Sequence, residues 1–150
     1  ELMQFLNDHL LNVISELYAT CYYALIDRKK GVISFAKAGH HHPLFWKKGS
    51  GDLAAIDCIG NGLGLMREAK FGYVQLPYEP GDKLLFFTDG IIEQTNSRKD
   101  MYSEAKLRSL FLDLIDRGEE NILDTIFRDL KEFTGDIPYE DDITMLLLEF

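Results

Sequence analysis

Successive apolar runs in this chain are joined by turns that are too short to hold a crossover helix. Residues 19–26 and 32–38 are rich in β-branched and aromatic side chains, and a charged turn of five residues separates them. Residues 73–76 and 83–87 flank a second turn, which contains Pro80-Gly81. Parallel strands need a connection of about a dozen residues or more, so these turns favour antiparallel pairing. The pattern argues against a βαβ nucleotide-binding fold.

The rest of the chain is interpreted as helices and further strands. An amphipathic helix is predicted over residues 2–17, where leucines recur at three- and four-residue spacing and Phe5, Val13 and Ile14 extend the apolar stripe. Further strands are predicted over residues 44–48, 53–56 and 143–150, and helices over 90–94, 103–115 and 121–133, with Ser103 as an N-cap. This order predicts one α+β domain, with antiparallel sheet and helices packed on its outer face.

Composition excludes several functional classes. The 150 residues carry a net charge of −9, and their basic residues are scattered, so nucleic acid is not an expected partner. The longest apolar runs span a few residues, whereas a membrane-spanning helix needs about 20. No signal peptide is visible. We therefore expect a cytoplasmic chain that does not insert into a membrane.

Acidic residues border two of the most apolar strands. Asp89-Gly90 follows residues 84–87, and Asp141-Asp142 precedes the final strand. If these two strands are antiparallel neighbours, Asp89 and Asp141 fall at the same edge of the sheet. Two carboxylates placed together repel each other, and a hard divalent cation such as Mg²⁺ or Mn²⁺ relieves that repulsion. Each motif also has a simpler interpretation, because Asp-Gly is a common turn and Asp-Asp can be a solvated loop.

Five segments, taken in order, resemble a known family. They are A-G-H-H-H-P-L at 38–44, G-L-G-L at 62–65, E-P-G-D at 79–82, F-T-D-G-I-I-E at 87–93 and D-D-I-T at 141–144. Together they resemble the phosphatases named after sporulation stage II protein E, the sigma-regulating bacterial branch of the type 2C metal-dependent Ser/Thr phosphatases. One departure is Gly62, which stands where that family usually has Pro.

The resemblance implies roles for individual residues. Asp89 and Asp141 would be metal ligands, with Asp141 favoured over Asp142 because the residue after the second ligand is usually Asn in the wider superfamily. Gly90 and Asp142 would lie near the site. His40 falls where the superfamily often has Asp, so it either faces the metal centre or serves as a hydrogen-bonded turn residue. In the complete domain two Mn²⁺ or Mg²⁺ ions share a water, which attacks a phosphoserine or phosphothreonine.

One motif of the family is missing from these 150 residues. In the family, the carboxylate that bridges the two ions comes from a motif resembling Gly-Asp-x-x-Gly-His-Gly. Gly-Asp pairs begin here at Gly51, Gly81 and Gly135, and none of them continues in that way. We therefore expect a single domain that is the C-terminal two-thirds of an α-β-β-α sandwich and lacks its N-terminal strands. Such a chain should bind Mn²⁺ or Mg²⁺ weakly, be inactive alone and form a homo-oligomer through its exposed sheet edge.

Three functions remain open from the sequence. The favoured one is part of an enzyme that dephosphorylates a phosphorylated bacterial regulator of the anti-anti-sigma type. The alternative is a non-catalytic interaction or dimerisation module derived from that fold, and the third is a metal-independent binding domain of unrelated origin. The presence of both Asp89 and Asp141 favours the enzyme, because decayed sites tend to lose their ligands.

Overall fold

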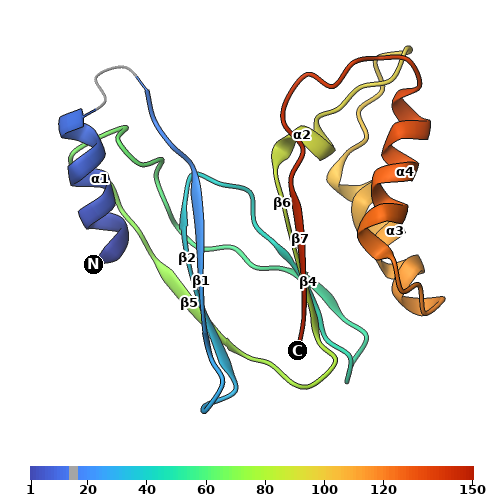
Figure 1. Cartoon of the computed structure of the whole chain (residues 1–150). Helices are drawn as coiled ribbons and strands as arrows, with labels where there is room; N and C mark the ends of the chain where they lie inside the picture. The colour runs from blue at the N-terminus through green and yellow to red at the C-terminus, as the bar shows by residue number, and fades with distance from the viewer. Residues whose placement is uncertain (14–16) are drawn as a thin grey trace.

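Two antiparallel sheets face each other in the computed structural model, which describes residues 1–13 and 17–150 (Figure 1). One sheet has the order β1-β2-β5, and its strands are β1 (Cys21–Asp27), β2 (Val32–Ala38) and β5 (Tyr73–Pro77). The other has the order β4-β3-β6-β7, and its strands are β3 (Leu44–Trp46), β4 (Leu53–Ala55), β6 (Lys83–Phe87) and β7 (Met145–Glu149). The expected antiparallel α+β architecture is confirmed.

Helices cover the outer faces of both sheets, so the chain has four layers in the order α-β-β-α (Figure 1). Helix α1 (Leu2–Val13) packs on the three-stranded sheet, and α3 (Glu104–Asp116) and α4 (Ile122–Thr134) pack on the four-stranded one. The short helix α2 (Asp89–Ile92) directly follows β6. None of the helices in the described residues is long and apolar enough to cross a membrane.

Side-chain alternation along the strands divides the interior into separate cores. In β6, Leu84 packs between the two sheets with Phe35 and Phe45, whereas Leu85 faces the α3–α4 layer with Phe111. Successive side chains of a strand point to opposite faces, so one strand serves two cores. Because both faces of the four-stranded sheet are covered, β6 is a continuous apolar run rather than an alternating one.

The first predicted hairpin is present. Strands β1 and β2 pair from Cys21–Ala38 to Asp27–Val32, and the carboxylate of Asp27 accepts the backbone N–H groups of Lys29 and Lys30 within the turn. The second short turn has a different role from the one expected. Strands β5 and β6 flank Pro80-Gly81 but belong to different sheets, so the turn carries the chain from one layer to the other.

Helix α1 is described from Leu2 to Val13, within the predicted range. Leu17 is not helical, and residues 14–16, including Ile14, lie outside the described part of the chain. Phe5 and Val13, which were expected on the apolar stripe, are 67% and 68% exposed. The buried polar residue of this helix is Asn7, whose amide donates to Met66 O and accepts from Gly64 N, at 3.0 and 2.9 Å.

The later helices follow the sequence signals more closely. Ser103 caps α3 as predicted, because its hydroxyl accepts the N–H of Lys106 at 3.3 Å. Helix α4 begins one residue later than predicted, and the side chain of Asn121 makes no capping hydrogen bond. The final strand is shorter than predicted and starts at Met145, which leaves Asp141 and Asp142 in the preceding loop.

Candidate functional site

Strands β6 and β7 are antiparallel neighbours, which is the condition for Asp89 and Asp141 to lie at the same end of the sheet. Their ladder ends at the pair Phe87–Met145, and Thr88 N donates to Thr144 O at 3.1 Å beyond it. Asp89 therefore leaves β6 at the edge where Asp141 leads into β7. Figure 1 shows α2 and the start of β7 together at this end of the sandwich. The expected placement of the two acidic motifs at one sheet edge is confirmed.

Gly90 allows the two acidic segments to approach closely. A Cβ atom at this buried position would lie 2.6 Å from Asp142 O and 3.4 Å from Asp141 Cβ. A contact of 2.6 Å with a backbone oxygen is too short for any side chain, so only glycine fits without a shift of the loop. Glycine at this position therefore brings the turn after β6 against the loop before β7.

Thr88 adds polar contacts between the same two segments. Its hydroxyl donates to Asp142 O and accepts from Thr144 N, both at 3.0 Å. A single hydroxyl thus satisfies one acceptor and one donor of the loop backbone. The sequence interpretation did not single out Thr88, although a hydroxyl residue directly before the Asp-Gly turn was the available signal.

The two candidate ligands are exposed to solvent and differ in their local contacts. Asp141 accepts the N–H of Asp142 at 2.7 Å through one oxygen. The carboxylate of Asp89 makes no hydrogen bond or ion pair with any residue in the described part of the chain. Among those residues no group of three or more His, Cys, Asp or Glu side chains converges on a point that could hold a metal ion. The roles of Asp89 and Asp141 as ligands stay predictions.

The three adjacent histidines contact three different partners. His40 Nδ1 lies 3.0 Å from the hydroxyl of Thr20, the ring of His41 lies 6.0 Å from that of Phe87, and His42 Nε2 lies 3.3 Å from Glu104 Oε2. The three side chains are therefore held by separate neighbours. His41 Nε2 is buried and has no hydrogen-bond partner in the described residues.

His40 is the histidine whose pKa is affected by the charge of Asp89. Burial lowers the pKa of His40 below its usual value, the negative charge of Asp89 opposes this, and His41 adds to the lowering. The imidazole is accordingly neutral near pH 7. His40 is hydrogen-bonded to Thr20 and is close enough to Asp89 for the two groups to interact electrostatically. Its functional role stays a prediction.

The glycine-rich segment 60–64 is a packing element. A Cβ atom on Gly60 would lie 1.7 Å from Lys37 O, so this glycine presses against the backbone of β2. The N–H of Gly39 donates to Gly60 O at 2.9 Å, which joins this segment to the start of the histidine loop. The contacts of this segment are therefore with the backbone of β2 and with the start of the histidine loop.

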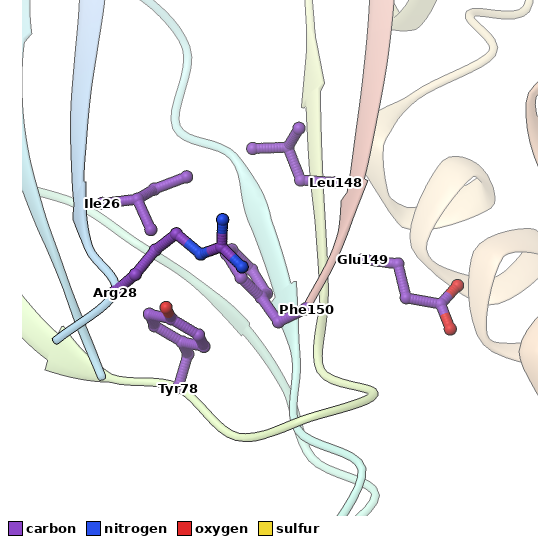
Figure 2. Close-up of a pocket in the computed structure, with 6 residues that line it drawn as sticks. All are labelled: Ile26, Arg28, Tyr78, Leu148, Glu149 and Phe150. Carbon is purple, nitrogen blue, oxygen red and sulfur yellow. The ribbon is translucent and has the colours of Figure 1, made fainter. Parts of the chain in front are cut away.

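Two hollows of the surface lie at opposite ends of the four-stranded sheet. One is an open groove of about 470 Å³ beside the acidic edge, lined by Phe127, Tyr139, Glu140, Asp141, Asp142 and Ile143. The other, of about 320 Å³, is lined by Ile26, Arg28, Tyr78, Leu148, Glu149 and Phe150 (Figure 2). Since Leu148 pairs with Leu84 near the start of β6, the second hollow is remote from Asp89. Only the first can belong to the acidic site.

Gln94 is a second contact residue that the sequence did not reveal. Its side-chain amide reaches the loop before Asp141, where it donates to Pro138 O and accepts from Glu140 N, both at 3.2 Å. Nothing in the local sequence marks this residue, because its partners lie more than 40 positions further along the chain.

Comparison with known proteins gives a consistent result. The family model described as Stage II sporulation protein E (SpoIIE) matches residues 1–150. Phosphoserine phosphatase RsbU of Bacillus subtilis is 21% identical over 137 residues, which are 91% of this chain and 40% of that protein. The chain spans 20% to 40% of the length of the curated relatives it matches.

Solved structures share the fold. The SiaA-PP2C domain of Pseudomonas aeruginosa superimposes with a TM-score of 0.75 at 16% identity and covers 99% of this chain and 69% of its own. The crystal structure of RsbX in complex with magnesium superimposes with a TM-score of 0.63 at 18% identity and covers 98% of this chain and 63% of its own. At such identities the structures establish the four-layer fold and not the activity.

Proposed function

Because this chain belongs to the SpoIIE family of PP2C-type serine phosphatases, we propose that it supplies Asp89 and Asp141 to the metal centre of a protein serine/threonine phosphatase. The observation that carries the proposal is the pairing of β6 with β7, which brings the two acidic segments to one sheet edge. The substrate class is a phosphorylated bacterial regulatory protein of the anti-anti-sigma type.

The side chains at this edge fit a hard divalent cation in part. Carboxylate oxygens are the protein ligands that Mg²⁺ and Mn²⁺ prefer, and Mg²⁺ commonly keeps several waters beside one or two carboxylates. Asp89 and Asp141 are exposed and supply two such carboxylates. The bridging carboxylate of the family motif is not among these 150 residues. We therefore expect the 150 residues alone to bind Mn²⁺ weakly and to be inactive.

The residues of this chain would hold and orient the reacting groups. Bound Mn²⁺ or Mg²⁺ would lower the pKa of a water molecule and neutralise charge on the phosphate. Asp89 and Asp141 would fix the ions, with Gly90 allowing the close approach of the two segments. His40, held by Thr20, presents a neutral imidazole on the same side. The groove beside Asp141 is where the polypeptide on one side of the phosphoserine would lie.

The test is Mn²⁺-dependent hydrolysis of p-nitrophenyl phosphate and of a phosphoserine protein by the full-length gene product. Asp89→Asn removes a charged ligand and several kcal/mol of charge stabilisation, which corresponds to a loss of activity of about 100-fold or more. The matched control is Asp52→Asn, an exposed carboxylate in the β3–β4 turn at the opposite end of the same sheet. This variant should keep the wild-type rate.

Two results would contradict the proposal. Equal rates for wild type and Asp89→Asn would remove Asp89 from the metal centre. A full-length protein that neither binds Mn²⁺ nor hydrolyses either substrate would instead support the non-catalytic interaction module. The expected homo-oligomer, which would form through an unpaired edge strand, also stays a prediction. Strand β1 lies at the edge of the three-stranded sheet, and its Tyr23 and Leu25 are exposed.

A further inference from the structure

Gln94 is a buried polar residue placed between the two acidic segments. The residue is only 2% exposed. It lies just beyond α2, five positions after Asp89. Its Nε2 donates to Pro138 O and its Oε1 accepts from Glu140 N, both at 3.2 Å. Both ends of the amide are thus used on the backbone of one loop.

Apart from the ring of Tyr139, which lies 6.1 Å from that of Phe127, that loop has little apolar packing to hold it. Residues 138–142 are all exposed, so the hydrophobic core does not fix their position. On the far side of Asp141 the loop is held by Thr88, whose hydroxyl contacts Asp142 O and Thr144 N. On the near side it is held by Gln94 through Glu140 N. Asp141 therefore lies between two hydrogen-bonded contacts, both of which come from the segment that carries Asp89.

We propose that Gln94 is a positioning residue for the metal centre, which sets the place of Asp141 relative to Asp89 without touching metal or substrate. This inference rests on the proposed function of the acidic edge. Ligands must be held to within about 0.5 Å of the productive geometry, and outer partners that orient them commonly affect metal affinity by about 10- to 100-fold. A loop held from one side only would leave Asp141 free to move relative to Asp89.

A purely structural role for Gln94 predicts something different. In that case its loss would lower stability and leave metal binding unchanged. Because Pro138 and Glu140 are exposed, water can replace the lost amide, so the fold should survive while the loop moves. The two roles are therefore separable by measuring loop dynamics, Mn²⁺ affinity and thermal stability on the same variants.

The variant is Gln94→Met in the full-length protein, which keeps the size of the side chain and removes its amide. Calorimetry with Mn²⁺ should give a dissociation constant about 10- to 100-fold higher than for wild type. The Mn²⁺ concentration for half-maximal hydrolysis should rise in parallel, whereas kcat at saturating Mn²⁺ changes little. Hydrogen–deuterium exchange should accelerate in the peptide that covers residues 138–142.

The matched structural control is Asp82→Asn, which alters a buried polar contact at the other end of β6. It should lower the melting temperature and leave the Mn²⁺ dissociation constant unchanged. If Gln94→Met does not fold, Gln94→Asn decides the question, because its shorter amide cannot reach both loop atoms and should weaken Mn²⁺ binding in the same direction.

The result that overturns the inference is faster exchange in residues 138–142, or a lower melting temperature, with an unchanged Mn²⁺ dissociation constant. Failure of the proposed function looks different, because then wild type and Asp89→Asn would bind Mn²⁺ equally. The two outcomes are thus distinguished by which variant differs from wild type.

Discussion

The two ends of strand β6 carry the same residue type in opposite circumstances. Asp82, at the start, is 1% exposed; its carboxylate accepts the N–H groups of Lys48 and Glu79 at 2.9 Å and lies 3.2 Å from Lys47 Nζ. Asp89, just past the end, is exposed and has no such partner in the described residues. An aspartate whose oxygens are all engaged holds the fold together, whereas one left open to solvent is available to a ligand.

The charge of Asp82 is stabilised locally. Burial would raise the pKa of its carboxyl, but the N–H groups of Glu79 and Lys48 and the ammonium of Lys47 outweigh this and lower it. The result is a fixed anion that anchors the turn between the two sheets. An acidic residue next to a strand is therefore informative about function only once its hydrogen-bond partners are known.

The largest effect is expected from the loss of Asp82. Asp82→Ala leaves Lys47 and two backbone N–H groups without their partner, and we expect a fall of about 3 kcal/mol in the free energy of unfolding. Urea denaturation measures this, with exposed Asp52→Ala as the control that should change little. Asp89→Asn should be the mirror case, with lost activity and unchanged stability. A small change in the free energy of unfolding of Asp82→Ala would show that the buried carboxylate does not anchor the turn.

A smaller effect is expected at the other end of the strand. Gly90→Ala places a Cβ atom 2.6 Å from Asp142 O, so the loop before β7 must shift. We expect a loss of about 2 kcal/mol in stability, typical of overpacking, together with weaker Mn²⁺ binding in the full-length protein. The control is Gly49→Ala, whose nearest neighbour is Glu79 Oε2 at 3.8 Å. Wild-type stability in Gly90→Ala would mean that the segments are not in close contact.

The smallest effect is the pH dependence of the Asp82 contribution. The pKa of Asp82 is lower in the folded state than in the unfolded state, so its contribution is complete above the unfolded value of about 4 and is lost as pH falls through the folded value. Asp82→Asn removes this titration. Urea denaturation at several pH values should show the difference between wild type and Asp82→Asn shrinking below about pH 4. A difference that stays constant down to pH 2 would contradict a lowered pKa.

Local patterns predicted the parts of the fold that depend on neighbouring residues. Strands β2 and β6 have the bounds that the apolar runs indicated, and Ser103 caps α3 as expected. The turn at Pro80-Gly81 was recognised, but its role was not. A short turn between strands predicts a hairpin. Here β5 pairs with β2 in one sheet, and β6 pairs with β3 and β7 in the other.

The sequence by itself placed Asp89 and Asp141 next to the ends of two apolar strands, because strand ends and acidic residues are local features. That these two strands pair, which forms the acidic edge, was a condition that only the fold met. Only the tertiary structure decided which contacts hold that edge. Gln94 and Glu140 are 46 positions apart, and no periodicity or spacing links them. The periodicity of apolar residues predicts the face of its own helix or strand on which a side chain lies. The partner that it meets depends on how distant elements pack, and this is set by burial of the whole core.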